Sequence, residues 1–174
     1  MRFREKKKSD ATLKLRGPDG CIDVAAWRER TDNADTKIEG DWAGERRLVS
    51  ASMDGELDDA ARSELAKPKP SVVRLLTGEQ RRLAHELMVP LAQVDLLGPI
   101  KAMKWEPERE GDVAAELWDV GPELRFLELS VLVTADPAGA LEALEKRVVD
   151  AGLKLEPLQD TKTSTVLRHL ETAG

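Results

Sequence analysis

Basic side chains recur at a spacing of two within the first sixteen residues of the sequence. Arg2 and Arg4 form one such pair, and Lys14 and Arg16 form another. In an extended strand, residues two apart point to the same face. Arginine and lysine are the side chains with which proteins hold phosphate groups. If these segments are strands, each pair therefore predicts a small patch that contacts a phosphorylated ligand.

Carboxylates follow the same spacing further along the chain. Glu39 and Asp41 share one face of a strand predicted over residues 37–42, and Lys37 lies on that face too. In the segment 126–133, Glu128 points away from a fully apolar face, which is formed by Leu127, Leu129, Val131 and Val133. Carboxylate oxygens suit Mg²⁺ or Mn²⁺. Basic and acidic side chains in one site would suit a polyphosphate that is bridged by a metal.

Strands and helices that would position these residues alternate in blocks. The predicted strands cover residues 2–8, 11–17, 37–42, 46–53, 92–106, 113–120 and 125–134. The predicted helices cover residues 56–66, 77–90, 137–151 and 161–172, and the second of them opens on a capping box of Thr77 with Gln80. Residues 17–36 are polar and are predicted to form a long loop around Trp27. This order indicates an α+β fold with a largely antiparallel sheet.

Composition limits the class of protein and its partners. The 174 residues fit a single domain, 1–174, which is large enough to bury its own core. The net charge of −6 argues against nucleic acid as a partner, although seven basic and two acidic residues give residues 1–16 a local charge of +5. Cys21 is the only cysteine, and no apolar stretch approaches 18 residues. We therefore expect a cytoplasmic protein that has no membrane partner.

Periodicity alone leaves two arrangements open for the charged strand faces. An antiparallel sheet with one solvated face is the commoner one. In the other, the sheet curls and the charged faces line a tunnel. Basic pairs on some strands and carboxylates on others favour the tunnel, because such a lining would hold a polyphosphate together with its metal.

Several segments carry a resemblance to the CYTH superfamily, the triphosphate tunnel metalloenzymes. Ala11 to Arg16 resembles the family's K-x-R strand, and Arg2-Phe3-Arg4 resembles its R-x-R strand. The resemblance continues through segments that are spread over nearly the whole chain, which are 37–39, 46–52, 97–105, 116–119 and 126–130. Lys162 lies where the family often has a C-terminal lysine. The order and spacing of these segments carry the resemblance, which is closest to the CYTH-like proteins of actinobacteria.

This resemblance implies an antiparallel β-barrel or tunnel of about seven or eight strands with helices packed outside. It implies a metal-dependent phosphohydrolase that acts on a triphosphate-containing small molecule or inorganic polyphosphate, with Mg²⁺ or Mn²⁺. The implied phosphate contacts are Arg2, Arg4, Lys14, Arg16 and Lys104. The implied metal ligands are Glu39, Asp119 and Glu128, whereas Glu116 and Trp118 are expected to face outward.

Two departures from the family pattern shape the expectation. The family's N-terminal E-x-E-x-K strand is not found, so the domain is expected to be N-terminally incomplete and open at one edge, where a second copy could pair. Ser130 stands where a second late carboxylate is usual. An alternative function is therefore a non-catalytic module that binds polyphosphate or a nucleotide. The sequence does not separate a hydrolase from a cyclase, and it does not name the substrate.

Overall fold

The computed structural model describes residues 1–4, 9–18, 20–30, 36–109, 111–157 and 159–172. The chain divides into two compact units. Unit 1 comprises Met1–Asp41 and Arg47–Leu97, and unit 2 comprises Trp42–Arg46 and Gly98–Gly174. The turn of one hairpin, Trp42–Arg46, thus belongs to unit 2, although most of its two strands belongs to unit 1. Each unit is described separately below.

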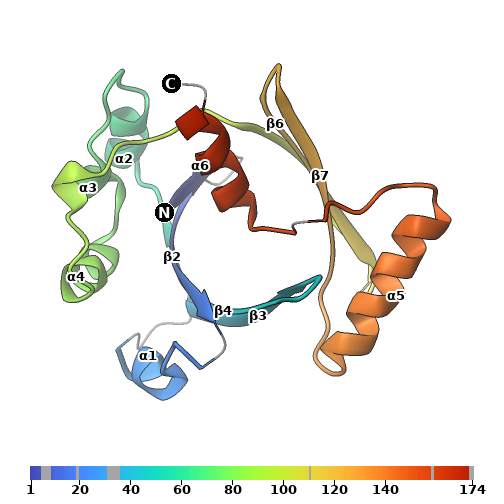
Figure 1. Ribbon diagram of the computed structural model, residues 1–174. Coiled ribbons are helices and arrows are strands. Elements are labelled where there is room, and N and C mark those ends of the chain that lie inside the picture. The colour runs from blue at the N-terminus through green and yellow to red at the C-terminus, as the bar shows by residue number, and fades with distance from the viewer. Residues whose placement is uncertain (5–8, 19, 31–35, 110, 158, 173–174) are drawn as a thin grey trace. The chain divides into compact units, whose positions relative to one another are not determined.

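A four-stranded sheet is the centre of unit 1, with hydrogen-bonded order β1-β2-β4-β3 (Figure 1). Its strands are β1 (Arg2–Arg4), β2 (Asp10–Pro18), β3 (Thr36–Ala43) and β4 (Arg46–Glu56). Both β1 and β4 pair with β2 in antiparallel fashion. The predicted pairing of the first two strands is therefore confirmed. The second strand begins one residue earlier than predicted, at Asp10. Residues 5–8 of the predicted first strand lie outside the described residues.

Helices cover one face of this sheet, and that face is the apolar one. The helical elements are α1 (Val24–Arg30), α2 (Asp59–Leu65), α3 (Val72–Leu75), α4 (Gly78–Glu86) and the short 3₁₀ turn η1 (Leu91–Gln93). Leu13 of β2 and Met53 of β4 pack with Trp27 of α1 and Leu83 of α4 in one buried cluster. A second cluster gathers buried residues at the other end, which are Ala11, Leu57, Ala61, Val72, Leu75 and Leu76.

Helix α4 is tied to the sheet through Gln80. The predicted capping box is confirmed, since Thr77 Oγ1 accepts from Gln80 N and Gln80 Oε1 accepts from Thr77 N. The Gln80 amide nitrogen also donates to the carbonyl oxygens of Ala11 and Met53 at 2.9 and 3.0 Å. One fully buried side chain therefore caps a helix and satisfies backbone groups on two strands. Gly55 leaves room for this contact, because a Cβ there would lie 2.6 Å from Thr77 Cγ2.

Two sequence-based predictions in unit 1 are wrong in part. Residues 17–36 are not all loop, because α1 occupies residues 24–30. Asp23 caps this helix, its Oδ1 accepting from Ala26 N at 2.9 Å, and burial of Trp27 holds the helix against the sheet. The strand predicted over 92–106 is also too long. Its first part forms η1 and extended chain, and only Lys101–Trp105 is a strand, which belongs to unit 2.

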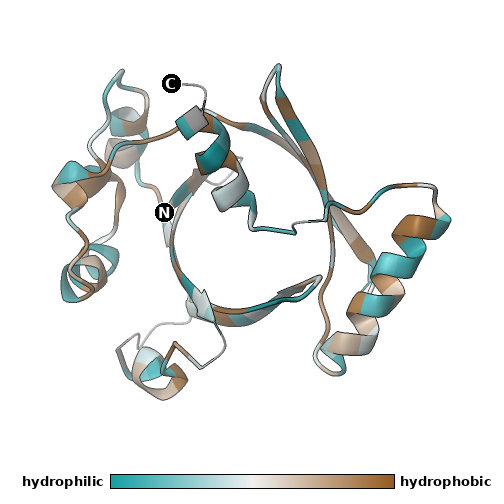
Figure 2. Ribbon diagram, in the orientation of Figure 1, coloured by the Kyte–Doolittle hydropathy of each residue, from teal (hydrophilic) through white to brown (hydrophobic). Residues whose placement is uncertain are grey.

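A three-stranded antiparallel sheet of order β5-β6-β7 is the centre of unit 2. Its elements are β5 (Lys101–Trp105), β6 (Val113–Gly121), β7 (Leu124–Val131), α5 (Pro137–Asp150) and α6 (Lys162–Thr172). Both helices are confirmed close to their predicted bounds. Helix α5 contacts β7. Brown and teal patches alternate along α5 and α6 in Figure 2, as expected of helices that bury one side.

The observed class is therefore α+β with antiparallel sheets, as predicted. Within the described residues the strands form two hydrogen-bonded sheets, and no closed barrel is found among them. In the same part of the chain, no helix combines the length and the apolar character needed to cross a membrane.

Candidate functional site

Nine polar or charged side chains lie together on the face of the unit 1 sheet opposite the helices, among others that share this face. We call this set the charged face, and it consists of Thr12, Lys14 and Arg16 of β2, Ser50, Ser52 and Asp54 of β4, and Lys37, Glu39 and Asp41 of β3. The register confirms the arrangement of β2 and β4, where Lys14 is paired with Ser52 and Arg16 with Ser50. Directly paired residues on antiparallel strands project to the same side.

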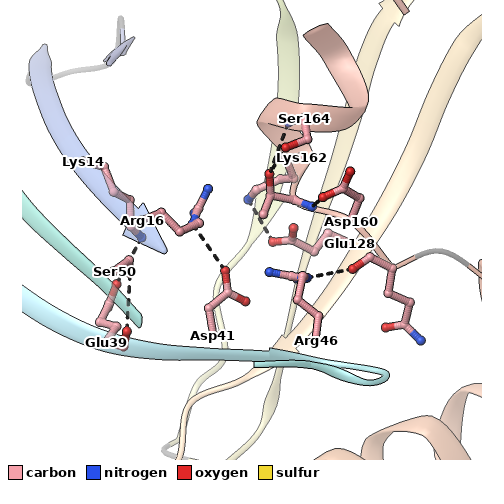
Figure 3. Close-up of polar contacts among 12 residues, drawn as sticks. Lys14, Arg16, Glu39, Asp41, Arg46, Ser50, Glu128, Asp160, Lys162 and Ser164 are labelled. Atoms are coloured by element: carbon pink, nitrogen blue, oxygen red, sulfur yellow. Dashed lines mark hydrogen bonds and ion pairs between the residues drawn. The ribbon is translucent and has the colours of Figure 1, made fainter. Parts of the chain in front are cut away.

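Ion pairs connect the outer strands of the charged face. Lys14 Nζ lies 3.4 Å from Glu39 Oε2, and Arg16 Nε lies 3.6 Å from Asp41 Oδ2 (Figure 3). Both pairs pass from β2 to β3, and β4 lies between these two strands in the sheet. The structure thus brings three of the sequence-predicted residues together, namely Lys14, Arg16 and Glu39. Asp41, which the sequence grouped with Glu39 by spacing alone, completes the set.

The cations at the start of the chain lie near this face. Arg2 is paired with Thr12, so Arg2 stands on the charged side of β1. Burial lowers the pKa of the Met1 amine, and the positive charges of Arg2 and Arg16 lower the pKa of that amine further. These residues therefore share one region of positive potential. Arg4 is paired with Asp10 in the backbone register, and its side chain lies outside the described residues.

Two glutamates and one lysine form a second cluster, which lies in unit 2. Glu116 of β6 and Glu128 of β7 are directly paired in the antiparallel register. Lys162 Nζ lies 2.5 Å from Glu116 Oε2. It also lies 2.8 Å from Glu128 Oε1 (Figure 3). We call this cluster the lysine-capped carboxylate pair. Like charges placed directly opposite each other repel, and the ammonium group between them offsets that repulsion.

Local structure fixes the position of Lys162. It is the first residue of α6, directly after Thr161, whose Oγ1 accepts from Ser164 N. A positive charge at a helix N-terminus is repelled by the positive end of the helix dipole. The two glutamates offset this repulsion because they pair with the Lys162 ammonium group. Lys162 Nζ further lies 5.3 Å from the centre of the Trp118 ring, which stacks on Phe126 at 5.8 Å. The expectation that Glu116 and Trp118 face outward is therefore wrong.

Asp119 does not join Glu128. The register pairs Asp119 with Arg125 and Glu116 with Glu128, and positions 116 and 119 point to opposite faces of β6. Asp119 Oδ2 accordingly accepts from Arg125 Nη2 at 3.0 Å. Glu116, and not Asp119, is therefore the carboxylate that shares the face of Glu128, and the role of Asp119 as a metal ligand stays a prediction. The only signal for this lies in the strand register, because the local sequence offers both carboxylates equally.

Lys104 stands on the same face of the unit 2 sheet as the lysine-capped carboxylate pair. Its register partner is Glu116. Its side chain forms an ion pair with Glu106 at 2.7 Å and is 42% exposed. The structure thus places Lys104 beside the pair without joining it to the cluster, and its predicted role as a phosphate contact stays a prediction.

Three carboxylates around one centre would be the simplest site for a divalent cation. In the described ranges, no group of three or more histidine, cysteine, aspartate or glutamate side chains is arranged around a common centre. Magnesium, however, is often held by one or two carboxylates together with substrate phosphates. Glu116 and Glu128 fit that mode as a donor pair, and Lys162 contacts both of them.

Comparison with known proteins identifies no relative of this chain. The sequence matches no family model, no curated protein and no solved structure.

Proposed function

We propose that the protein binds a triphosphate group on the charged face of unit 1 and acts as a metal-dependent phosphohydrolase of the CYTH type. The observation that supports this most is the pairing of two strand-borne cations with two carboxylates, Lys14 with Glu39 and Arg16 with Asp41. Lys14 and Arg16 are separated by two strand residues, which is roughly 6–7 Å. That separation allows both cations to contact neighbouring phosphoryl groups of one polyphosphate chain.

The metal is a separate part of the proposal, and it concerns unit 2 by itself. Glu116 and Glu128 are the carboxylates that would hold Mg²⁺ or Mn²⁺. Divalent cations of this kind neutralise the charge of phosphoryl oxygens in polyphosphate ligands. The barrel or tunnel remains part of the proposal, and it rests on the sequence resemblance and not on the two sheets as described.

Phosphate release from tripolyphosphate tests the enzyme. The protein is incubated with tripolyphosphate and Mn²⁺, Mg²⁺ or EDTA, and free orthophosphate is measured. We expect release that requires the metal and that falls by at least about tenfold in Arg16→Ala, because a hydrogen bond to a charged group is lost. Arg82→Ala removes an exposed arginine of α4 and is the matched control. Absence of release from the unmodified protein with either metal would refute the hydrolase.

A second candidate function is a module that binds the triphosphate without turnover. Lys162 contacts both carboxylates of the proposed metal pair, and Ser130 stands on β7 in place of a second late carboxylate. Titration calorimetry with tripolyphosphate separates the two functions, because binding without phosphate release supports the module. Thermal unfolding adds a measure of selectivity. Tripolyphosphate should raise Tm more than the same concentration of orthophosphate, and Arg16→Ala should remove most of that difference.

A further inference from the structure

The middle of the charged face is occupied by two small hydroxyl residues. Ser50 and Ser52 lie on β4, directly paired with Arg16 and Lys14. Both serines are buried, with 1% and 5% of their surfaces exposed. Ser50 Oγ donates to the backbone oxygen of Glu39, at a long 3.4 Å. Both hydroxyl groups therefore lie underneath other side chains, and the contact of Ser50 is a weak one.

The side chains above the serines are the two ion pairs. Neighbouring strands are about 4.8 Å apart, so β2 and β3 are separated by about 10 Å across β4. Only long side chains can meet over that distance, and only small residues on β4 leave space beneath them. Lys14 with Glu39 and Arg16 with Asp41 satisfy the first condition, and the two serines satisfy the second.

These ion pairs are loose compared with the one in unit 2. Their N···O distances are 3.4 and 3.6 Å, whereas Lys162 approaches Glu128 to 2.8 Å. Arg16 Nε is buried and has no hydrogen-bond partner within the described part of the chain. A buried N–H group without an acceptor is costly. An acceptor oxygen placed above Ser50 would satisfy Arg16 better than Asp41 does.

We propose that Lys14, Arg16, Ser50 and Ser52 form a subsite for one phosphoryl group. Without a ligand, the carboxylates of Glu39 and Asp41 pair with the two cations in place of the phosphoryl oxygens. A phosphoryl group of the ligand displaces the two carboxylates, accepts from both cations and receives hydrogen bonds from the serine hydroxyls. This inference rests on the proposed triphosphate ligand and assigns two further features of its site. The serines bind the ligand, and the β3 carboxylates compete with it. In this subsite Glu39 is a competitor and not a metal ligand.

Anion affinity in the absence of metal tests the inference. Titration calorimetry with tripolyphosphate is carried out in EDTA on the full chain and its variants. Asp41→Asn and Glu39→Gln should each bind about two- to fivefold more tightly, because each removes a competing charge held by a partly exposed ion pair. Ser50→Ala combined with Ser52→Ala should bind about tenfold more weakly, because hydrogen bonds to a charged group are lost. Asp95→Asn and Ser63→Ala, exposed positions of unit 1, are the matched controls and should leave affinity unchanged.

The outcomes separate this inference from the proposed function. If Arg16→Ala abolishes binding but Asp41→Asn and Glu39→Gln do not tighten it, the carboxylates do not compete and the inference fails, while triphosphate binding stands. Weaker binding in Glu39→Gln only when Mn²⁺ is present would assign Glu39 to the metal and would also overturn it. Tighter binding in the carboxylate variants without any phosphate release would support the subsite and refute the hydrolase. Thermal unfolding of each variant shows whether a loss of affinity comes from loss of the fold.

Discussion

Glu116 and Glu128 face each other across neighbouring antiparallel strands, and the ammonium group of Lys162 lies within 2.8 Å of both carboxylates. Replacement of the lysine should leave two like charges in contact on a partly buried face. We expect Lys162→Met to lower the free energy of unfolding by about 1–3 kcal/mol, measured by denaturant titration. Lys146→Met removes an exposed helical ion pair with Asp150 and should cost less than about 0.5 kcal/mol.

The same variant tests the carboxylate pair as a cation site. In Lys162→Met, Mn²⁺ can contact Glu116 and Glu128 without competition from the ammonium group. Mn²⁺ should therefore raise the Tm of Lys162→Met more than that of the unmodified protein, since a ligand of the folded state stabilises it by mass action. Addition of Glu116→Gln should remove the effect. If the two proteins respond equally to Mn²⁺, the pair does not hold the metal.

Gly55 is the point of closest approach between β4 and the start of α4. A methyl group there would lie 2.6 Å from Thr77 Cγ2 and 3.0 Å from Gln80 Oε1. Gly55→Ala should therefore destabilise unit 1 by about 1–3 kcal/mol through overpacking. Thr77→Ser keeps the capping hydroxyl and removes the methyl group. The double variant should regain part of the stability, and a cost that is the same with or without Thr77→Ser would contradict this contact.

Glu64 makes the stability of unit 1 depend on pH in acidic solution. The hydrogen bond from Lys67 lowers the pKa of Glu64 most, and a backbone hydrogen bond from Ser71 and the nearby charges of Lys67 and Arg74 add to this. A carboxyl group with a depressed pKa stabilises the folded state above its unfolded pKa of 4.5. That contribution is lost as the pH falls through the lower, folded value. The difference in stability between the protein and Glu64→Gln should thus be constant above about pH 5 and should shrink in more acidic solution, as measured by urea unfolding at each pH.

Hydrogen exchange with tripolyphosphate tests the proposed tunnel. Backbone amides of β2 and β4 should exchange more slowly when the ligand is bound, because binding suppresses local opening. A tunnel predicts the same slowing in β6 and β7. Slowing that is confined to unit 1 would contradict the tunnel and leave binding on the charged face intact. Orthophosphate at equal concentration is the control for a general effect of anions.

Side-chain alternation was sufficient to predict much of the fold and of the charged face. The segment 11–16 places leucines and cations on opposite sides, and Leu13 is buried in the cluster that α1 and α4 form with the sheet, whereas Leu15 is 38% exposed. The start of α4 was equally predictable, because Thr77 and Gln80 form its capping box within four consecutive residues. Such features depend on neighbours in the chain, so the sequence contains them.

Features that depend on pairing between distant segments were predicted less well. Glu116 and Asp119 are three residues apart and equally acidic, and only the register with β7 decides which of them shares a face with Glu128. Helix α1 was missed because the polar residues around it resemble a loop, whereas burial of Trp27 in the core supports a helix there. The local signal for this helix is Asp23 as an N-cap, followed by Val24 and Trp27 at helical spacing.

The strict alternation along β2 restricts how this strand can change in length. Leu13 is buried in the core, while Lys14 and Arg16 stand on the opposite face. Insertion or deletion of a single residue within the strand would exchange the two faces beyond that point and would direct the cations into the core. A change of two residues would preserve the faces and shift only the pairing with β4. Insertions and deletions that preserve the fold should accordingly lie in the turns. Within β2, they should add or remove two residues at a time.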